Sequence, residues 1–276
     1  MSESDTGSYR IREVSRSMEK ELERLRVQTI LGWEKESRAL RHFGLRDGMS
    51  VLEVGMGPGF VTEQLLALLP HSVITGVDFD PVMVETAEQQ LRYMRGDRVQ
   101  LVHGSIMQMP LPDDSYDFAL ARFLFQHLPD PVGAAREVLR VLKPGGIFAI
   151  HDVDAEVGGL GEPAMSPEMM EILTRADTLQ TRQGGNTKIG RQLPRILKQA
   201  GFAQLDMDIM LVHSDIVGME RMAILWDEER LWPALKAGII TQADFDRVRV
   251  DLAAYRANPA SLEAYTLLFA KGMKPE

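Results

Sequence analysis

An acid followed by three glycines at alternate positions is the most informative short stretch of the chain. The segment Val51–Phe60 reads VLEVGMGPGF, so Glu53 stands two residues before Gly55, and Gly57 and Gly59 follow. Glycine lets the backbone turn sharply and lets a ligand touch the main chain. A carboxylate beside such a turn would repel a pyrophosphate and would suit a ligand with a positive charge.

The spacing of these glycines separates two kinds of nucleotide site. A dinucleotide fingerprint reads G-x-G-x-x-G, and the amino terminus of its helix holds a pyrophosphate. Here the third glycine falls one residue early, as G-x-G-x-G. The spacing counts against a nicotinamide cofactor, but an NAD-dependent oxidoreductase stays open as an alternative.

A second acid, Asp78, closes the apolar segment 74–78. In open α/β sheets, ligands bind outside the carboxyl ends of the strands, and a carboxylate there has lone pairs for both hydroxyls of a ribose. This role would serve NAD and other nucleosides alike, but together with Glu53 it favours a cation that carries a ribose. The alternative is that Asp78 caps the helix from Pro81, for which Asp80 is better placed.

Two further residues are candidates for a catalytic base. His127 follows the apolar segment 118–122 by a few residues, and Asp152 ends the segment 146–152. Each also has a structural interpretation: a histidine there often packs at a helix start, and the aspartate could accept from loop amides.

Short apolar segments alternate with helical patterns along the first half of the chain. This rhythm predicts an α/β fold in which a doubly wound, mainly parallel sheet carries helices on both faces. The expected strands are 50–54, 72–77, 99–103, 118–122 and 146–152, and the expected helices are 59–69, 81–95 and 131–142.

The pattern divides the chain into four parts. We expect an N-terminal helical cap over 1–44 and a cofactor-binding core over 45–155. A helical lid insertion over 156–195 follows. The last part, 196–276, completes the sheet and carries a helical insertion over 214–258.

The bulk composition restricts the class of partner. The formal net charge of −9 counts against sequence-independent nucleic-acid binding, which relies on Lys and Arg. The absence of cysteine removes disulfides and zinc–thiolate sites, and we expect no metal. The amino terminus does not resemble a signal peptide and no apolar run reaches membrane-spanning length, so we expect a cytoplasmic protein without a membrane partner. The sequence leaves open whether the protein forms a homodimer.

Four motifs in this order resemble the class I S-adenosylmethionine-dependent methyltransferases, and most of all the small-molecule branch related to the ubiquinone/menaquinone methyltransferases. The resemblance is close over about 45–155 and looser beyond, and it implies a Rossmann-like sheet of seven strands. The motifs are EVGMGPG at 53–59, GVDFDP at 76–81, HGSIMQMPLPDDSYD at 103–117 and VLKPGG at 141–146.

The resemblance also implies roles for single residues toward S-adenosylmethionine. Ser105 departs from the family pattern, because an acid often stands there to accept from the adenine amino group. The implied contacts are the methionyl part for Gly55, Gly57 and Gly59; its amino group for Glu53; the ribose for Asp78; the adenine for Phe79, Ser105 and Ile106; the sulfonium region for Arg122; and cover from the N-terminal segment, with Tyr9 and with Gln28 near the carboxylate end.

Three functions follow as hypotheses. The first is methylation of oxygen, nitrogen or carbon on a small acceptor, which the Met, Leu and Trp content of the insertions suggests is apolar or aromatic. The second is a reaction other than methyl transfer, such as a cyclisation, on the same cofactor-binding fold. The third is the NAD-dependent oxidoreductase. Because the fold binds the donor and the insertions choose the acceptor, only the donor has a strong signature in the sequence.

Overall fold

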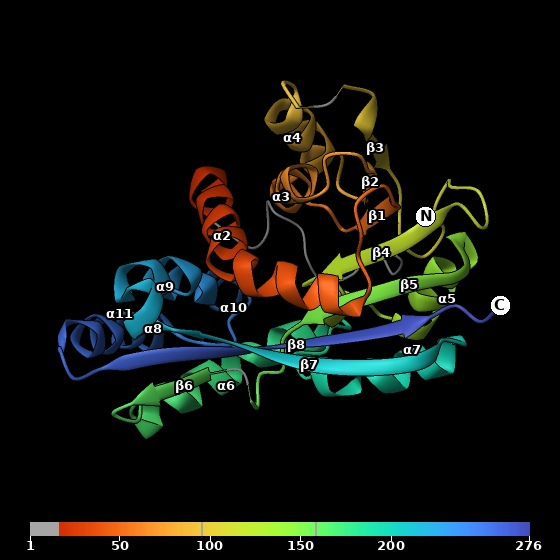
Figure 1. The fold of residues 1–276 in the computed structure, drawn as a ribbon. Helices are drawn as coiled ribbons and strands as arrows, with labels where there is room; N and C mark the ends of the chain where they lie inside the picture. The colour runs from red at the N-terminus through yellow and green to blue at the C-terminus, as the bar shows by residue number, and fades with distance from the viewer. Residues whose placement is uncertain (1–16, 95, 158) are drawn as a thin grey trace.

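One sheet of eight strands organises the computed structural model, which describes residues 17–276 except 95 and 158. The strand order is β3-β2-β1-β4-β5-β8-β6, and β7 pairs with β8 (Figure 1). Strands β1 to β5 pair in parallel, whereas β8 runs antiparallel to β5, β6 and β7. The strands are β1 (Ser50–Val54), β2 (Val73–Asp78), β3 (Val99–His103), β4 (Tyr116–Arg122), β5 (Leu142–Asp152), β6 (Gly159–Glu162), β7 (Ala203–His213) and β8 (Leu262–Met273).

The doubly wound parallel sheet is therefore confirmed, with one strand more than the seven expected. The extra strand, β6, lies within the segment 156–195 that we expected to be helical. Strand β8 is long, and β5 covers only its residues 268–273. Strand β6 pairs with residues 262–265 of β8 and so satisfies backbone groups that β5 leaves without a partner.

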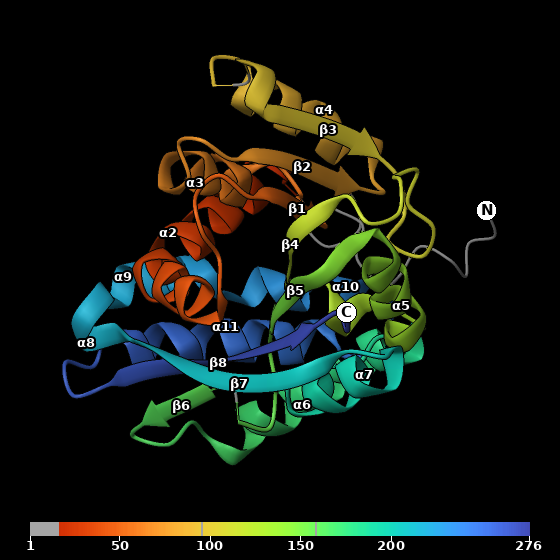
Figure 2. The same ribbon diagram turned by 45° about the vertical axis from the view of Figure 1, so that its right-hand side comes forward.

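Helices cover both faces of the sheet. Two of them start as the sequence suggests, with an aspartate cap followed by a proline: Asp80 accepts from the amide of Val82, and Asp130 from that of Gly133. In Figure 2, α2 and α3 lie on one side of the central strands and α5 and α7 on the other. The helices are α2 (Met18–Phe43), α3 (Phe60–Leu68), α4 (Pro81–Leu91), α5 (Pro131–Val141) and α7 (Leu193–Ala200).

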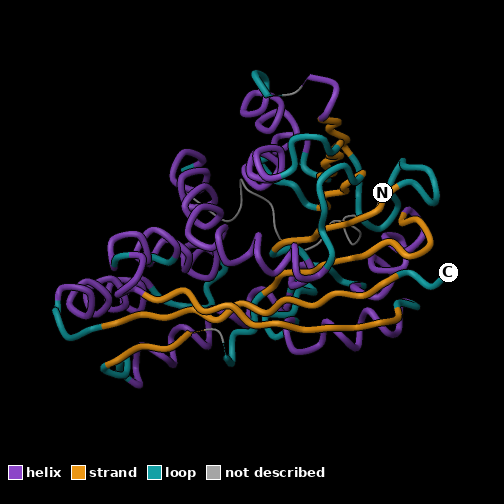
Figure 3. Tube along the Cα trace, viewed as in Figure 1, coloured by secondary structure: helices purple, strands orange, loops and turns teal. Residues whose placement is uncertain are grey.

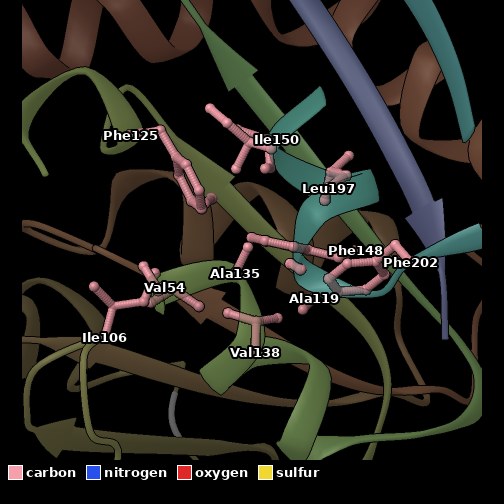
Figure 4. Packing of buried hydrophobic residues seen from close by; sticks show 14 of the residues in the cluster. Val54, Ile106, Ala119, Phe125, Ala135, Val138, Phe148, Ile150, Leu197 and Phe202 are labelled. Atoms are coloured by element: carbon pink, nitrogen blue, oxygen red, sulfur yellow. The ribbon is translucent and has the colours of Figure 1, made fainter. Parts of the chain in front are cut away.

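The hydrophobic core forms a layer on each face. Figure 4 shows Phe125, Phe148 and Phe202 close together between the sheet and the helices α5 and α7. The ring centroids of Phe125 and Phe148 are 5.7 Å apart, and those of Phe148 and Phe202 are 5.8 Å apart. The second layer packs α2 and α3 against the opposite face and includes Leu40, Phe43 and Phe118. These two layers fix the strand ends that carry the candidate site.

Two of the C-terminal helices and α6 form a separate apolar cluster beyond the parallel strands. Figure 3 shows the β7–β8 pair running from the central sheet toward these helices. Among the described residues, no helix is long and apolar enough to cross a membrane. The helices of this cluster are α6 (Pro167–Arg182), α10 (Trp232–Lys236) and α11 (Gln242–Ala257). Two shorter C-terminal helices, α8 (Ser214–Val217) and α9 (Met219–Leu225), pack against the second core layer instead.

Candidate functional site

A cavity of about 960 Å³ opens where the carboxyl ends of β1, β2 and β4 approach α2. One part of its wall is the turn after β1 and the end of β2. The other part is largely apolar and comes from α6 and from the segment between α9 and α10. Small-ligand pockets typically measure about 300–1,000 Å³, so this one has room for a nucleoside and a second small molecule.

The glycine turn places backbone, not side chains, against the cavity. Gly55 and Gly57 line it, with φ of 71° and 53°, a region that favours glycine. Gly59 does not line the cavity, so the expected contact with the methionyl part of the cofactor is limited to Gly55 and Gly57. A Cβ at Gly59 would come within 3.1 Å of Leu91 and 3.2 Å of Ala87. The third glycine therefore serves the close packing of α3 on α4.

Asp78 has the geometry expected of a ribose acceptor. It lines the cavity, and its carboxylate accepts from the amide of Gly57 at 2.8 Å and from that of Asp80 at 2.9 Å. One bond to each oxygen leaves lone pairs for two hydroxyls. Burial raises its pKa to about 6, so the group is ionised at neutral pH. The helix cap is Asp80, as expected.

Glu53 corrects the electrostatic expectation. The residue is buried beside the cavity and accepts a hydrogen bond from the hydroxyl of Thr62 at 2.6 Å. Burial raises its pKa to about 8, so the side chain is mostly protonated at neutral pH when no cation is bound. Glu53 therefore gives the site a carboxyl that can ionise and not the standing negative charge that we expected. A cation bound nearby would favour its charged form.

Arg122 lines the cavity as expected, but its guanidinium is held by α2. Its Nε lies 3.1 and 3.0 Å from the two carboxylate oxygens of Glu36, and Nη2 donates to the carbonyl of Gln28 at 2.9 Å. Gln28 also lines the cavity, which brings α2 to the site. Glu36 is not among the site residues expected from the sequence. The sequence feature that indicates Glu36 is its spacing: it lies four residues from both Gly32 and Leu40, on the buried face of α2.

The residues expected around an adenine lie together on the cavity wall. Phe79, Ser105 and Ile106 all line it. The Ser105 hydroxyl accepts from the amide of Met107 at 3.2 Å and so also supports the local turn. Tyr9, expected over the cofactor, lies outside the described residues.

His127 lines the cavity, but its surroundings do not suit a proton acceptor. Burial, followed by the charges of Arg230 and Arg24, lowers its pKa to about 3. Its Nδ1 lies 3.4 Å from the side-chain nitrogen of Gln180. The imidazole is therefore neutral, and the two guanidiniums disfavour the cation that it would become as a base.

Asp152 is fully buried and is not part of the cavity wall. It accepts from the amides of Gln126 at 3.1 Å and Val153 at 2.9 Å, while burial raises its pKa to about 7. The structure thus favours the loop-amide interpretation over contact with a substrate. Among residues 17–94, 96–157 and 159–276, no group of three potential ligands could hold a metal ion.

Comparisons with known proteins agree with this geometry. Residues 52–150 match the family model described as "Methyltransferase domain". The chain is 32% identical over 152 residues to demethylmenaquinone methyltransferase of Staphylococcus aureus, which covers 53% of this chain and 61% of the relative. The chain therefore spans about three fifths of the length of the curated relatives it matches.

Two solved structures are similar in fold. One is Haemonchus contortus phosphoethanolamine N-methyltransferase 2 in complex with S-adenosyl-L-methionine, with a TM-score of 0.59, 19% identity and coverage of 98% of this chain and 61% of that one. The other is the [4+2]-cyclase SpnF, with a TM-score of 0.53, 24% identity and coverage of 84% and 76%. At these identities the likeness establishes the fold alone.

Proposed function

We propose that residues 52–150, which match the family model described as "Methyltransferase domain", form a class I S-adenosylmethionine-dependent methyltransferase core. We further propose that the protein transfers a methyl group from S-adenosylmethionine to a small, mainly apolar acceptor. The observation that carries the proposal is the two-part cavity. Its polar part offers the turn amides and Asp78, and its larger part offers apolar side chains from the lid and the C-terminal helices.

The residues on the cavity wall fit the cofactor. The open lone pairs of Asp78 suit ribose hydroxyls, and the glycine turn leaves space where a methionyl chain would approach backbone. When bound, S-adenosylmethionine supplies an electrophilic methyl group on a sulfonium that is a good leaving group. The protein then has to hold the acceptor atom in line with the bond that breaks and to keep water out.

The apolar part of the cavity supports an apolar or aromatic acceptor. Met170, Leu173 and Leu179 come from α6, and Trp226 and Leu231 come from the segment after α9. His127 lines the cavity and is of the residue type that most often acts in acid–base catalysis. Because its pKa is low, we expect it to orient the acceptor and not to take its proton. An acceptor that is already a nucleophile at neutral pH fits this site best.

A first experiment tests the cofactor. Calorimetry with S-adenosylhomocysteine and with NAD should give binding of the first only. Replacing Asp78 with Ala should weaken that binding by about 1–3 kcal/mol, because two ribose hydrogen bonds are lost. An Asp97→Ala variant on the exposed surface should bind as the parent does. Unchanged affinity in Asp78→Ala would remove the ribose assignment.

A second experiment tests the reaction. The cofactor labelled in its methyl group is incubated with a panel of apolar, aromatic and charged acceptors. Label in an apolar or aromatic product supports the proposal, and turnover of charged polar acceptors only would contradict it. A product that forms with cofactor bound but carries no label would favour a reaction other than methyl transfer. Such a reaction is the second candidate, because a cyclase has a similar fold.

A further inference from the structure

The buried pair between Glu36 and Arg122 sets the charge that the cavity presents to its ligand. We infer that Glu36 is the counter-ion that lets a cavity lined by an arginine accept a cationic cofactor, and that it thereby decides the preference for the sulfonium donor over its neutral thioether product. The inference rests on the proposed function, because it concerns that same ligand.

The geometry places the charge of Arg122 beside the cavity. It ends β4, one residue beyond Ala121, which pairs with Val54 at the start of the glycine turn. Its side chain is 7% exposed and lines the same cavity as Glu53 and Gly55. Such a guanidinium without a partner would be an unscreened positive charge beside the bound sulfonium.

Glu36 neutralises that charge from α2. Its carboxylate is fully buried, and both of its oxygens lie within 3.1 Å of Arg122 Nε. Although burial alone would raise its pKa, the guanidinium of Arg122 is the main group that brings the pKa of Glu36 down to about 2. Glu36 is therefore a carboxylate at any physiological pH.

His151 does not share this role. Its Nδ1 lies 3.2 Å from Glu36 Oε1, but neither ring nitrogen forms a hydrogen bond within the described part of the chain. The ring stacks on Phe269, with centroids 4.0 Å apart, and burial lowers its pKa, so it is neutral. The charge of Arg122 is thus balanced by Glu36, while the histidine fills space between them and β8.

An anchoring role and a charge-balancing role of Glu36 predict different effects on ligand binding. If Glu36 only anchors α2 to the sheet, its loss would weaken the binding of every ligand of the cavity by the same factor. If it balances charge, its loss would weaken the binding of the cationic ligand selectively. S-adenosylmethionine and S-adenosylhomocysteine differ by the methyl group and positive charge on sulfur, so the ratio of their affinities isolates the charge effect.

The test measures this ratio by calorimetry at pH 8. Glu53 lines the cavity, interacts with the charge of Arg122 and could ionise in response. Every protein in the test therefore carries Glu53→Gln, which copies the uncharged state of Glu53. In this background, Glu36→Gln should shift the ratio toward the thioether by roughly tenfold or more. Adding Arg122→Gln should return the ratio to that of the background. Glu137→Gln, which removes one of the acidic partners of Arg140 on α5 outside the cavity, is the matched control and should not move the ratio.

The outcomes separate the hypotheses. Equal weakening of both ligands by Glu36→Gln, or a ratio that the second substitution does not restore, would overturn the inference. If the parent protein binds neither ligand, the proposed function fails, and that result is distinct from a ratio that stays constant. Removing one partner of a buried pair is strongly destabilising, so folding is checked by circular dichroism.

If Glu36→Gln does not fold, Arg122→Gln alone provides the test. Glu36 is then a buried carboxyl that has lost its cationic partner and that a bound sulfonium can ionise, so the ratio should move toward the sulfonium at pH 8. A ratio that moves toward the thioether, or does not move, would contradict the charge-balancing role.

Discussion

At the scale of single residues, burial decides which carboxyls carry charge. Glu53 and Glu36 are both fully buried glutamates near Arg122, yet their pKa values lie at about 8 and about 2. The difference is the partner: Glu36 contacts the guanidinium directly, whereas the partner of Glu53 among the described residues is the Thr62 hydroxyl. The same residue type is therefore a fixed anion at one position and a titratable group at the other.

The state of Glu53 predicts a proton released on cofactor binding. A sulfonium beside this carboxyl lowers its pKa, so binding of S-adenosylmethionine at pH 7 should release more protons than binding of S-adenosylhomocysteine does. Calorimetry in buffers of different ionisation enthalpy measures this difference. Glu53→Gln should abolish it, and equal release for the two ligands would show that Glu53 does not respond to the positive charge.

At the scale of elements, the C-terminal lobe is tied to the sheet by another buried pair. Arg256 of α11 reaches Glu263 of β8, with Nε 2.7 Å from Oε1 and Nη2 3.1 Å from Oε2. Arg256 also donates to the carbonyl of Trp226 at 2.6 Å. The pair therefore joins α11 to the segment after α9 and to β8, and the latter two form part of the cavity wall on the acceptor side.

Breaking this pair should loosen the lobe. Glu263→Gln leaves a mostly buried guanidinium without a counter-ion, and we expect a loss of about 3 kcal/mol in the free energy of unfolding. Hydrogen exchange in α11 should rise along with it. Asp246→Asn, which removes an exposed ion pair with Arg249 on the same helix, should cost less than about 0.5 kcal/mol. Similar effects for the two variants would mean that the buried pair does not hold the lobe.

At the scale of the whole molecule, the buried carboxyls of Glu53 and Asp152 lower the free energy of unfolding at alkaline pH. Burial raises the pKa of Glu53 to about 8 and of Asp152 to about 7. The unfolded chain ionises both near pH 4, so it binds fewer protons than the folded protein up to pH 8, and stability falls as the pH rises. Below pH 6.5 the buried His127 and His151 act in the opposite sense, because the unfolded chain protonates them more readily.

Above pH 6.5 the opposing contribution of the histidines fades, so the effect of the carboxyls dominates from pH 6.5 to 8. Over this window, we expect the free energy of unfolding of the ligand-free protein to fall by about 2 kcal/mol. Urea unfolding at the two pH values measures the change. A Glu53→Gln, Asp152→Asn double variant should show a much smaller change, and stability that rises with pH over this window would refute the assignment.

The sequence by itself determined the order of the elements in the parallel half, the position of the glycine turn and the place of Asp78 at the end of β2. These follow from local causes: the period of apolar residues, cap residues such as Asp80 and Asp130, and backbone angles that favour glycine. The helical patterns and strand segments of the parallel half were placed to within a few residues for the same reason.

Only the tertiary structure decided what depends on distant parts of the chain. It brought Glu36 to Arg122 across 86 positions, gave Gly59 to helix packing, turned Asp152 toward loop amides and added β6 to the open part of β8. It also set the protonation of Glu53, because desolvation arises from the packing of several elements at once. Local patterns carry no information on that burial, which is why the charge of the site could not be predicted from them.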